Sequence, residues 1–139
     1  MTRFVLDASV VLAWVLDNPV PAYASRVEQA LVGGQRAMVP ALWHLEVANG
    51  LATAERRRDL ASADIEHALF LLGAAASRAI DTETNLVSIE DALRTARVYH
   101  LTAYDAVYLN LARDQNLPLA TLDQGLCEAA SKAGVKPLL

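Results

Sequence analysis

The sequence consists of short apolar runs that alternate with longer segments of helical periodicity. Residues 4–6, 37–39 and 117–122 are apolar runs too short for stable helices, and they have the composition of buried strands. Strands that alternate with helices predict parallel pairing, with both faces of the sheet covered, because each crossover connection is a helix. We therefore expect an α/β fold, formed as one domain by residues 1–139.

The remaining elements are predicted from periodicity and from the positions of glycine and proline. A further strand is possible near Ala79-Ile80, and a last strand is expected at residues 135–139. Helices are expected at residues 10–16, 22–32, 41–57, 62–77, 86–99, 104–115 and 124–133.

Composition limits the class of protein. At 139 residues and 54% apolar content, the chain can bury a core without disulfides, and its single cysteine, Cys127, excludes both an internal disulfide and a cysteine-based zinc site. The longest uncharged apolar run, residues 68–77, has ten residues, fewer than the roughly 18 that a membrane span needs. No cleavable leader is visible at the N-terminus, so we expect a cytoplasmic protein with no membrane partner.

The net charge of −4 argues against a protein that binds nucleic acid through bulk positive charge. Ten of the twelve cations are arginines, and Arg56, Arg57 and Arg58 are consecutive. Because the guanidinium fork suits phosphate, Arg56 and Arg57 are candidate contacts to an RNA backbone. The alternative is a solvated helix end, where cations favour the C-terminal dipole.

Two acids directly follow predicted strands. Ligand sites of parallel sheets lie at this position, outside the carboxyl ends of the strands. Asp7 follows residues 4–6, and Asp123 follows residues 117–122. Each could simply cap the next helix, but the two together would place carboxylates in the same crevice.

Two further acids lie on predicted helices. Glu46 and Asn49 share one face of the helix at 41–57, which otherwise is largely apolar, and this pattern predicts a mostly buried helix with one polar seam rather than a solvated stripe. Asp105 ends a Thr102-Ala103-Tyr104-Asp105 capping box, and even in that role its carboxylate could hold a cation. Clustered carboxylates need a neutralising cation, and oxygen ligands favour Mg²⁺ or Mn²⁺, which support phosphodiester hydrolysis.

The other reactive residue types are predicted to be structural. His44, His67 and His100 lack zinc-binding spacing. Cys127 is expected in the core. Tyr104 and Tyr108 are expected to pack against the sheet, with base stacking as the alternative. Either core packing or a partner surface would explain Trp14, Trp43 and the apolar segment 68–76.

Four motifs, in this order, resemble the PIN-domain nucleases, and the chain length resembles the VapC-type toxins of bacterial toxin–antitoxin pairs. The motifs are Val5-Leu6-Asp7-Ala8-Ser9, Glu46-Val47-Ala48-Asn49, Tyr104-Asp105-Ala106-Val107-Tyr108 and Leu119-Ala120-Thr121-Leu122-Asp123.

The resemblance implies a functional centre and its partners. Asp7, Glu46, Asp105 and Asp123 would form a catalytic Mg²⁺ or Mn²⁺ centre. Our mechanistic hypothesis is that Asp7 and Asp105 bind the ion directly, while Glu46 and Asp123 complete its shell or orient the attacking water. Ser9, Asn49 and Thr121 would support it by hydrogen bonds. The implied fold is a parallel sheet of about five strands. The implied activity is cleavage of single-stranded RNA by a homodimer that a cognate antitoxin inhibits in a hetero-oligomer, by occupying the active-site groove.

Two other functions compete with this one. The first is a catalytically silent PIN-like module that binds a partner, in which the acids serve only as helix caps. The second is a phosphoryl-transfer α/β domain, which Asp7-Ala8-Ser9 disfavours because no second aspartate lies close to it, and because no lysine lies between Thr121 and Lys132.

Overall fold

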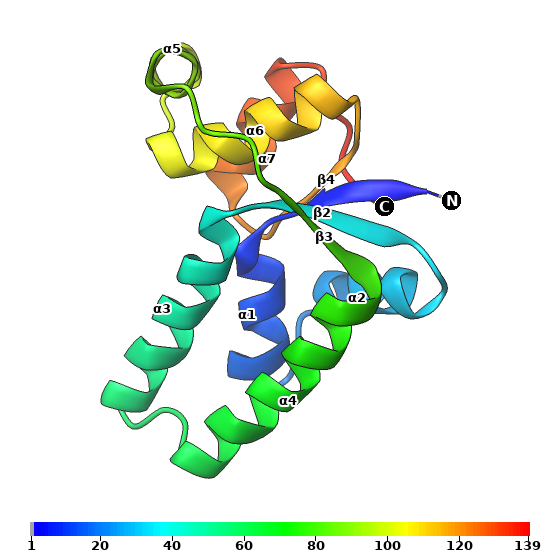
Figure 1. Ribbon diagram of the computed structural model, residues 1–139, viewed down its shortest axis with the longest axis vertical. Coiled ribbons are helices and arrows are strands. Elements are labelled where there is room, and N and C mark those ends of the chain that lie inside the picture. The colour runs from blue at the N-terminus through cyan, green and yellow to red at the C-terminus, as the bar shows by residue number, and fades with distance from the viewer. Residues whose placement is uncertain (1) are drawn as a thin grey trace.

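A sheet of four short parallel strands forms the centre of the computed structural model, which describes residues 2–139. The strands are β1 (Arg3–Leu6), β2 (Arg36–Pro40), β3 (Ile80–Glu83) and β4 (Leu119–Ala120), in the order β3-β2-β1-β4 (Figure 1). β1 lies between β2 and β4, and its apolar side chains are fully buried. The expected α/β fold with a parallel sheet is confirmed, and the carboxyl ends of all four strands meet at one edge.

Helices form a layer on each side of this sheet (Figure 1). One layer contains α1 (Ala8–Leu16), α2 (Ala22–Val32), α3 (Leu42–Arg56) and α4 (Ser62–Ala79). The other contains α5 (Ile89–Tyr99), α6 (Ala103–Gln115) and α7 (Gln124–Lys132). Within residues 2–139, no helix is long and apolar enough to cross a membrane.

Side-chain caps set the starts of α5 and α6. The Ser88 hydroxyl accepts a hydrogen bond from Asp91 N–H at 3.2 Å, so α5 begins after Ser88 and not at residue 86 as the periodicity predicted. Thr102 caps α6 in the same way, through Asp105 N–H at 3.1 Å.

The predicted fifth strand, at residues 135–139, is wrong. This segment forms a single parallel bridge to β4, between Leu119 and Pro137. Leu119 N–H donates to Lys136 O and Leu138 N–H donates to Leu119 O, both at 3.0 Å. Because β4 has only two residues, the pairing stops at this bridge and does not continue into a strand.

α3 is buried on one face only, which corrects the expectation of a mostly buried helix. Trp43, Val47 and Leu51 repeat every four residues and face the core. On the opposite side, Leu45 is 75% exposed, although it is apolar. Apolar residues on a helix can face solvent when no second layer covers them, and composition alone does not reveal this.

Four smaller expectations had mixed outcomes. Cys127 is exposed rather than in the core, because Leu126, Ala129 and Ala130 form the buried face of α7. Tyr104 is 65% exposed, whereas Tyr108 is fully buried as expected. Trp43 is buried. In the segment 68–76, Ala68 is buried but Leu69, Phe70 and Leu71 are exposed.

α1 and α3 pack closely at Gly50. A Cβ atom on Gly50 would lie 2.5 Å from Leu12 Cδ2, whereas one on Gly73, in α4, would meet nothing within 4 Å. Since α1 begins beside Asp7 and α3 carries Glu46, this contact fixes the distance between the helices that position two of the acids.

Substitution by alanine should have different effects on stability at Gly73 and at Gly50. Gly73→Ala should raise the free energy of unfolding by about 0.5–1 kcal/mol, because alanine favours a helix over glycine. Gly50→Ala should lack this gain, because Leu12 must move to admit the new methyl group. Urea denaturation of both variants tests this, and equal gains at the two positions would contradict the close approach of α1 and α3.

Candidate metal centre

Acidic side chains from both helical layers converge at the carboxyl edge of the sheet. Asp7 follows β1, and Asp123 follows the turn after β4. Glu46 lies in the second turn of α3, and Asp105 lies in the first turn of α6, in the opposite layer. Parallel strand order therefore brings together four acids that are far apart in the sequence.

Asp7 is held by hydroxyl groups and not by a capping bond. It occupies the position before α1, but its side chain makes no capping hydrogen bond, so the cap interpretation does not apply to it. The carboxylate is 5% exposed, and its Oδ2 accepts from Ser9 Oγ at 2.7 Å and from Thr121 Oγ1 at 2.8 Å. These bonds leave Oδ1 without a side-chain donor.

Ser9 and Thr121 also tie Asp7 to the turn between β4 and α7. Ser9 Oγ accepts from Leu122 N–H, and Thr121 Oγ1 accepts from Asp123 N–H, both at 3.0 Å. The expected hydrogen bonds from Ser9 and Thr121 to a carboxylate are therefore present. Asn49 is exposed, and the described hydrogen bonds do not connect it to any of the four acids.

Asp123 caps α7, which is the structural role that the sequence analysis left open for it. Its Oδ1 accepts from Leu126 N–H at 2.8 Å, and the side chain is otherwise exposed. The second carboxylate oxygen, Oδ2, accepts none of the described hydrogen bonds, and the charge of Asp123 raises the pKa of both Asp7 and Asp105.

Glu46 is bound by a residue to which the sequence analysis gave only a packing role. Tyr108 OH donates to Glu46 Oε1 at 2.6 Å, and the tyrosine is fully buried. The pKa of Tyr108 is raised by burial and by the bond to Glu46, so the phenol remains a donor. The available signal was its position: Tyr108 lies three residues after Asp105, hence on the same face of α6.

The acids raise one another's pKa values. Burial raises the pKa of Asp105 to about 6, with contributions from the charges of Asp123 and Asp7. Burial also raises the pKa of Asp7, and the charge of Asp123 raises it further. The hydrogen bonds from Ser9 and Thr121 lower this pKa, but they do not cancel the effect of burial.

The same forces act on Glu46. Its pKa is raised first by burial, lowered by the Tyr108 bond, and raised again by the charges of Asp7 and Asp105. The ion pairs found among residues 2–139 involve Asp81, Glu90 and Asp91, so no arginine or lysine there neutralises the four acids.

This donor set fits Mg²⁺ or Mn²⁺. All the donors are oxygens, and their mutual repulsion favours a divalent cation. Within residues 2–139, no three acidic, histidine or cysteine side chains are close enough to ligate one ion directly. Mg²⁺ commonly retains several waters and takes only one or two carboxylates, so a more open arrangement suits it.

The candidate phosphate contacts lie far from the acids. Arg56 ends α3 and Arg57 follows it, both exposed, and Arg56 donates to Thr53 Oγ1 at 3.4 Å. Ten residues of helix separate Arg56 from Glu46, or about 15 Å along the axis. The structure therefore does not bring the arginines into the acidic centre.

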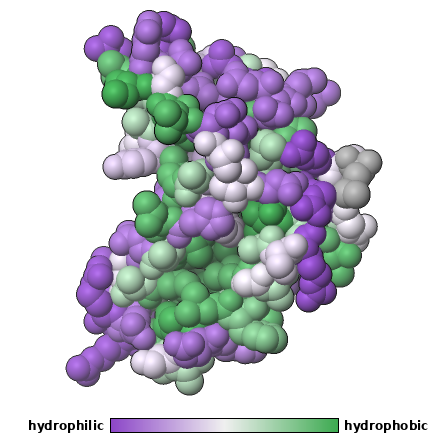
Figure 2. Space-filling view, viewed as in Figure 1, coloured by the Kyte–Doolittle hydropathy of each residue, from purple (hydrophilic) through white to green (hydrophobic). Residues whose placement is uncertain are grey.

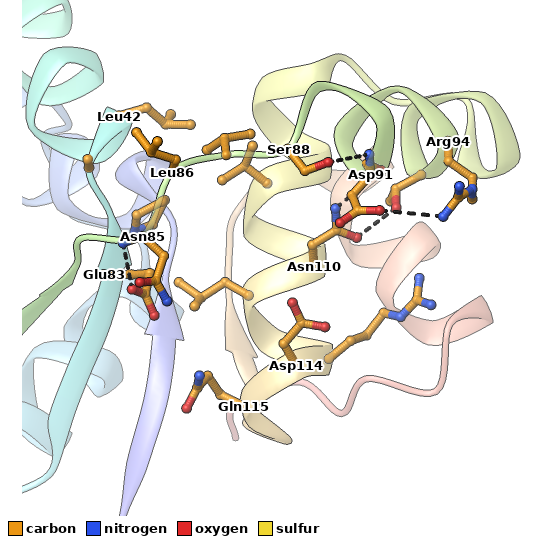
Figure 3. Close-up of a pocket in the computed structure, with 17 residues that line it drawn as sticks. Leu42, Glu83, Asn85, Leu86, Ser88, Asp91, Arg94, Asn110, Asp114 and Gln115 are labelled. Atoms are coloured by element: carbon orange, nitrogen blue, oxygen red, sulfur yellow. Dashed lines mark hydrogen bonds and ion pairs between the residues drawn. The ribbon is translucent and has the colours of Figure 1, made fainter.

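A cleft of about 560 Å³ lies beside the centre rather than in it. It is formed by the ends of β2 and β3, the segment before α5, and one face of α6, and Figure 3 shows the side chains of Glu83, Asn110 and Asp114 around it. None of the four acids lines this cleft. It is therefore a separate feature of the surface.

Comparison with known proteins identifies the family. The PIN domain family model matches residues 4–132. PIN domains are a family of nucleases, many of which act as toxins and typically use Mg²⁺. No curated protein matches the sequence significantly.

Two solved structures show the same fold. The crystal structure of PAE2754 from Pyrobaculum aerophilum is 22% identical, with a TM-score of 0.70, and the match covers 92% of this chain and 84% of that one. A domain of a functionally unknown protein from Methanocaldococcus jannaschii is 14% identical, with a TM-score of 0.59, over 100% and 91% of the two chains. At these identities the likeness supports the fold alone. With the family model spanning nearly all of its elements, the chain belongs to the PIN domain family.

Proposed function

We propose that this protein is a metal-dependent endoribonuclease and the toxin of a toxin–antitoxin pair. The observation that carries the proposal is the convergence of four carboxylates at the carboxyl edge of the sheet, none of which is paired with a cation among residues 2–139. They are those of Asp7, Glu46, Asp105 and Asp123. Retaining such repulsion costs stability, which is typical of a functional site rather than of structural caps.

Mg²⁺ or Mn²⁺ bound here would supply an activated water and would stabilise the charge that develops on the scissile phosphate. Asp7 would hold the ion through Oδ1, because Ser9 and Thr121 already occupy Oδ2. Asp105 is the second direct ligand in this proposal. Glu46 and Asp123, each with one oxygen committed to a protein donor, would orient the attacking water with the other oxygen.

No protein nucleophile takes part in this mechanism. The Ser9 and Thr121 hydroxyls both donate to Asp7, and none of the described hydrogen bonds joins them to a histidine that could activate them. RNA would lie across the acidic centre, and a strand that continues along α3 would bring its phosphates to Arg56 and Arg57.

Exposed apolar residues support the proposed protein partners, an antitoxin and a second copy of the chain. On α4, Phe70 is 75% exposed, and its neighbours Leu69 and Leu71 are also exposed. Figure 2 shows apolar residues gathered in a hollow over the region between α3 and α4, with hydrophilic residues around it. Leu86 and Ile89, at the start of α5, are a second exposed apolar group.

The test is cleavage of a single-stranded RNA pool by the purified protein, free of antitoxin, with Mg²⁺, with Mn²⁺ and with a chelator. We expect cleavage that requires metal and that falls at least about a hundredfold in Asp105→Asn. Asp114→Asn is the matched control, because Asp114 is an exposed acid on the same helix, and it should cleave like the wild type.

Two results would decide against the proposal. Cleavage that persists in the chelator would remove the metal from the mechanism. If the protein neither cleaves RNA nor binds Mn²⁺, but binds a partner through its apolar surfaces, the silent binding module is the correct function.

A further inference from the structure

We propose that Tyr108 is a positioning residue of the acidic centre, whose buried phenol holds Glu46 with its second carboxylate oxygen toward Asp7 and Asp105. The inference rests on the proposed function, since it concerns how this chain prepares the same centre. It assigns a role to a residue that otherwise would be taken as core.

The bond between Tyr108 and Glu46 crosses the end of the sheet. Tyr108 belongs to α6 and Glu46 to α3, and these helices lie on opposite faces (Figure 1). The phenol oxygen is 2.6 Å from Glu46 Oε1, and the tyrosine is fully buried, so the ring cannot turn its hydroxyl to water. Leu109 and Leu111, next to it on α6, are also buried and hold the helix in place.

Glu46 needs such an anchor. Its side chain is half-buried near a surface, and the charges of Asp7 and Asp105 repel it. Without an attractive contact, repulsion would favour rotamers that point to solvent, where carboxylates are well hydrated. Within residues 2–139, the one side-chain hydrogen bond to the Glu46 carboxylate comes from the Tyr108 hydroxyl. The negative charge of the carboxylate strengthens this hydrogen bond.

The position of Tyr108 on α6 adds a geometric consequence. Asp105 and Tyr108 are three residues apart, so they project from neighbouring points on one helical face. A single rigid helix therefore supplies one acid directly and fixes a second acid from the other layer. The Tyr108 hydroxyl thus ties the Glu46 carboxylate to α6, the helix that also carries Asp105.

The experiment measures Mn²⁺ affinity by calorimetry, together with the kinetics of RNA cleavage. Tyr108→Phe keeps the buried ring and removes only the hydroxyl. We expect Mn²⁺ affinity to fall about tenfold and kcat to fall by a similar factor, because loss of an outer contact to a metal ligand has effects of this size. KM for RNA should stay within about twofold, since Tyr108 is too deeply buried to touch the substrate.

Thr95→Val is the matched control. The Thr95 hydroxyl is buried and donates to Asn110 Oδ1 at 2.7 Å, so this variant also removes a buried hydroxyl bond that holds α6, but away from the acids. It should lose thermal stability as Tyr108→Phe does, with Mn²⁺ affinity and kcat unchanged.

A double variant separates positioning from general support of the fold. In a Glu46→Ala background, Tyr108→Phe should cause no further loss of Mn²⁺ affinity, because the residue through which it acts is gone. Additive losses would overturn the proposal, as would a Tyr108→Phe protein that binds Mn²⁺ like the wild type. If the wild type itself binds no Mn²⁺, both this inference and the proposed function fail, whereas the two preceding results overturn only the role of Tyr108.

Discussion

Asp7→Asn is expected to reduce RNA cleavage at least about a hundredfold and to leave the protein folded. The amide oxygen can still accept hydrogen bonds from Ser9 and Thr121, as Asp7 Oδ2 does. The amide nitrogen then stands where Oδ1 was, and it offers protons in place of a lone pair to the ion. Since a buried negative charge is removed, the thermal midpoint in a chelator should not fall.

The control for this variant is Asp81→Asn. Asp81 lies in β3 and accepts from Arg36 through both carboxylate oxygens, at 2.7 and 3.0 Å. Its loss should lower the thermal midpoint without affecting cleavage, because the pair is structural. Cleavage by Asp7→Asn within threefold of the wild type, measured alongside this control, would remove Asp7 from the catalytic centre.

The second large effect is on stability, and its sign is opposite to that of most substitutions. The pKa of Asp105 is 3.8 in a model peptide and about 6 in the folded, metal-free protein. Between these values the folded state binds more protons than the unfolded state, so the free energy of unfolding falls as pH rises through this window. Above about pH 6 the charged carboxylate destabilises the metal-free fold by a constant amount.

Asp105→Asn should therefore stabilise the protein in a chelator at pH 7.5. After allowance for the partial exposure of Asp105, we expect a gain of about 1–2 kcal/mol, or about 5 °C in the thermal midpoint. Mn²⁺ should raise the midpoint of the wild type, but should have much less effect on the variant.

Thermal melts at pH 5 and 7.5, with chelator and with Mn²⁺, measure both effects. Asp114→Asn should behave like the wild type in all four conditions, because Asp114 is exposed on the same helix. At pH 5 the gain from Asp105→Asn should shrink, since the wild-type carboxyl is then largely protonated. A lower midpoint for Asp105→Asn in the chelator at pH 7.5 would show that the Asp105 charge does not oppose folding.

The acids could be found from the sequence because local patterns define their positions. Asp7 and Asp123 follow apolar runs, and parallel strands carry such residues to one edge. Glu46 and Asp105 were located by helical periodicity and by a capping motif, which depend on nearby residues alone. The helical layers and the parallel sheet followed from the same alternation.

The errors arose where tertiary contacts decide. Whether Leu45 and Cys127 are buried depends on which layer covers each helix, and periodicity does not specify the layer. The bond between Tyr108 and Glu46 joins residues 62 positions apart, so helical spacing could place Tyr108 on the face of Asp105 but could not identify Glu46 as its partner. The strand-like run at residues 135–139 forms only one bridge, because its neighbour β4 has only two residues.

The pairing of β1 with β4 has a consequence for the time course of synthesis. Val5 pairs with Leu119, so β1 gains this neighbour only after 114 further residues have been translated, which takes on the order of ten seconds at typical rates of synthesis. Until then Asp7 lacks the Thr121 hydroxyl, and Asp123 does not yet exist in the chain. The nascent chain therefore lacks a complete acidic centre until residues 119–123 have been synthesised.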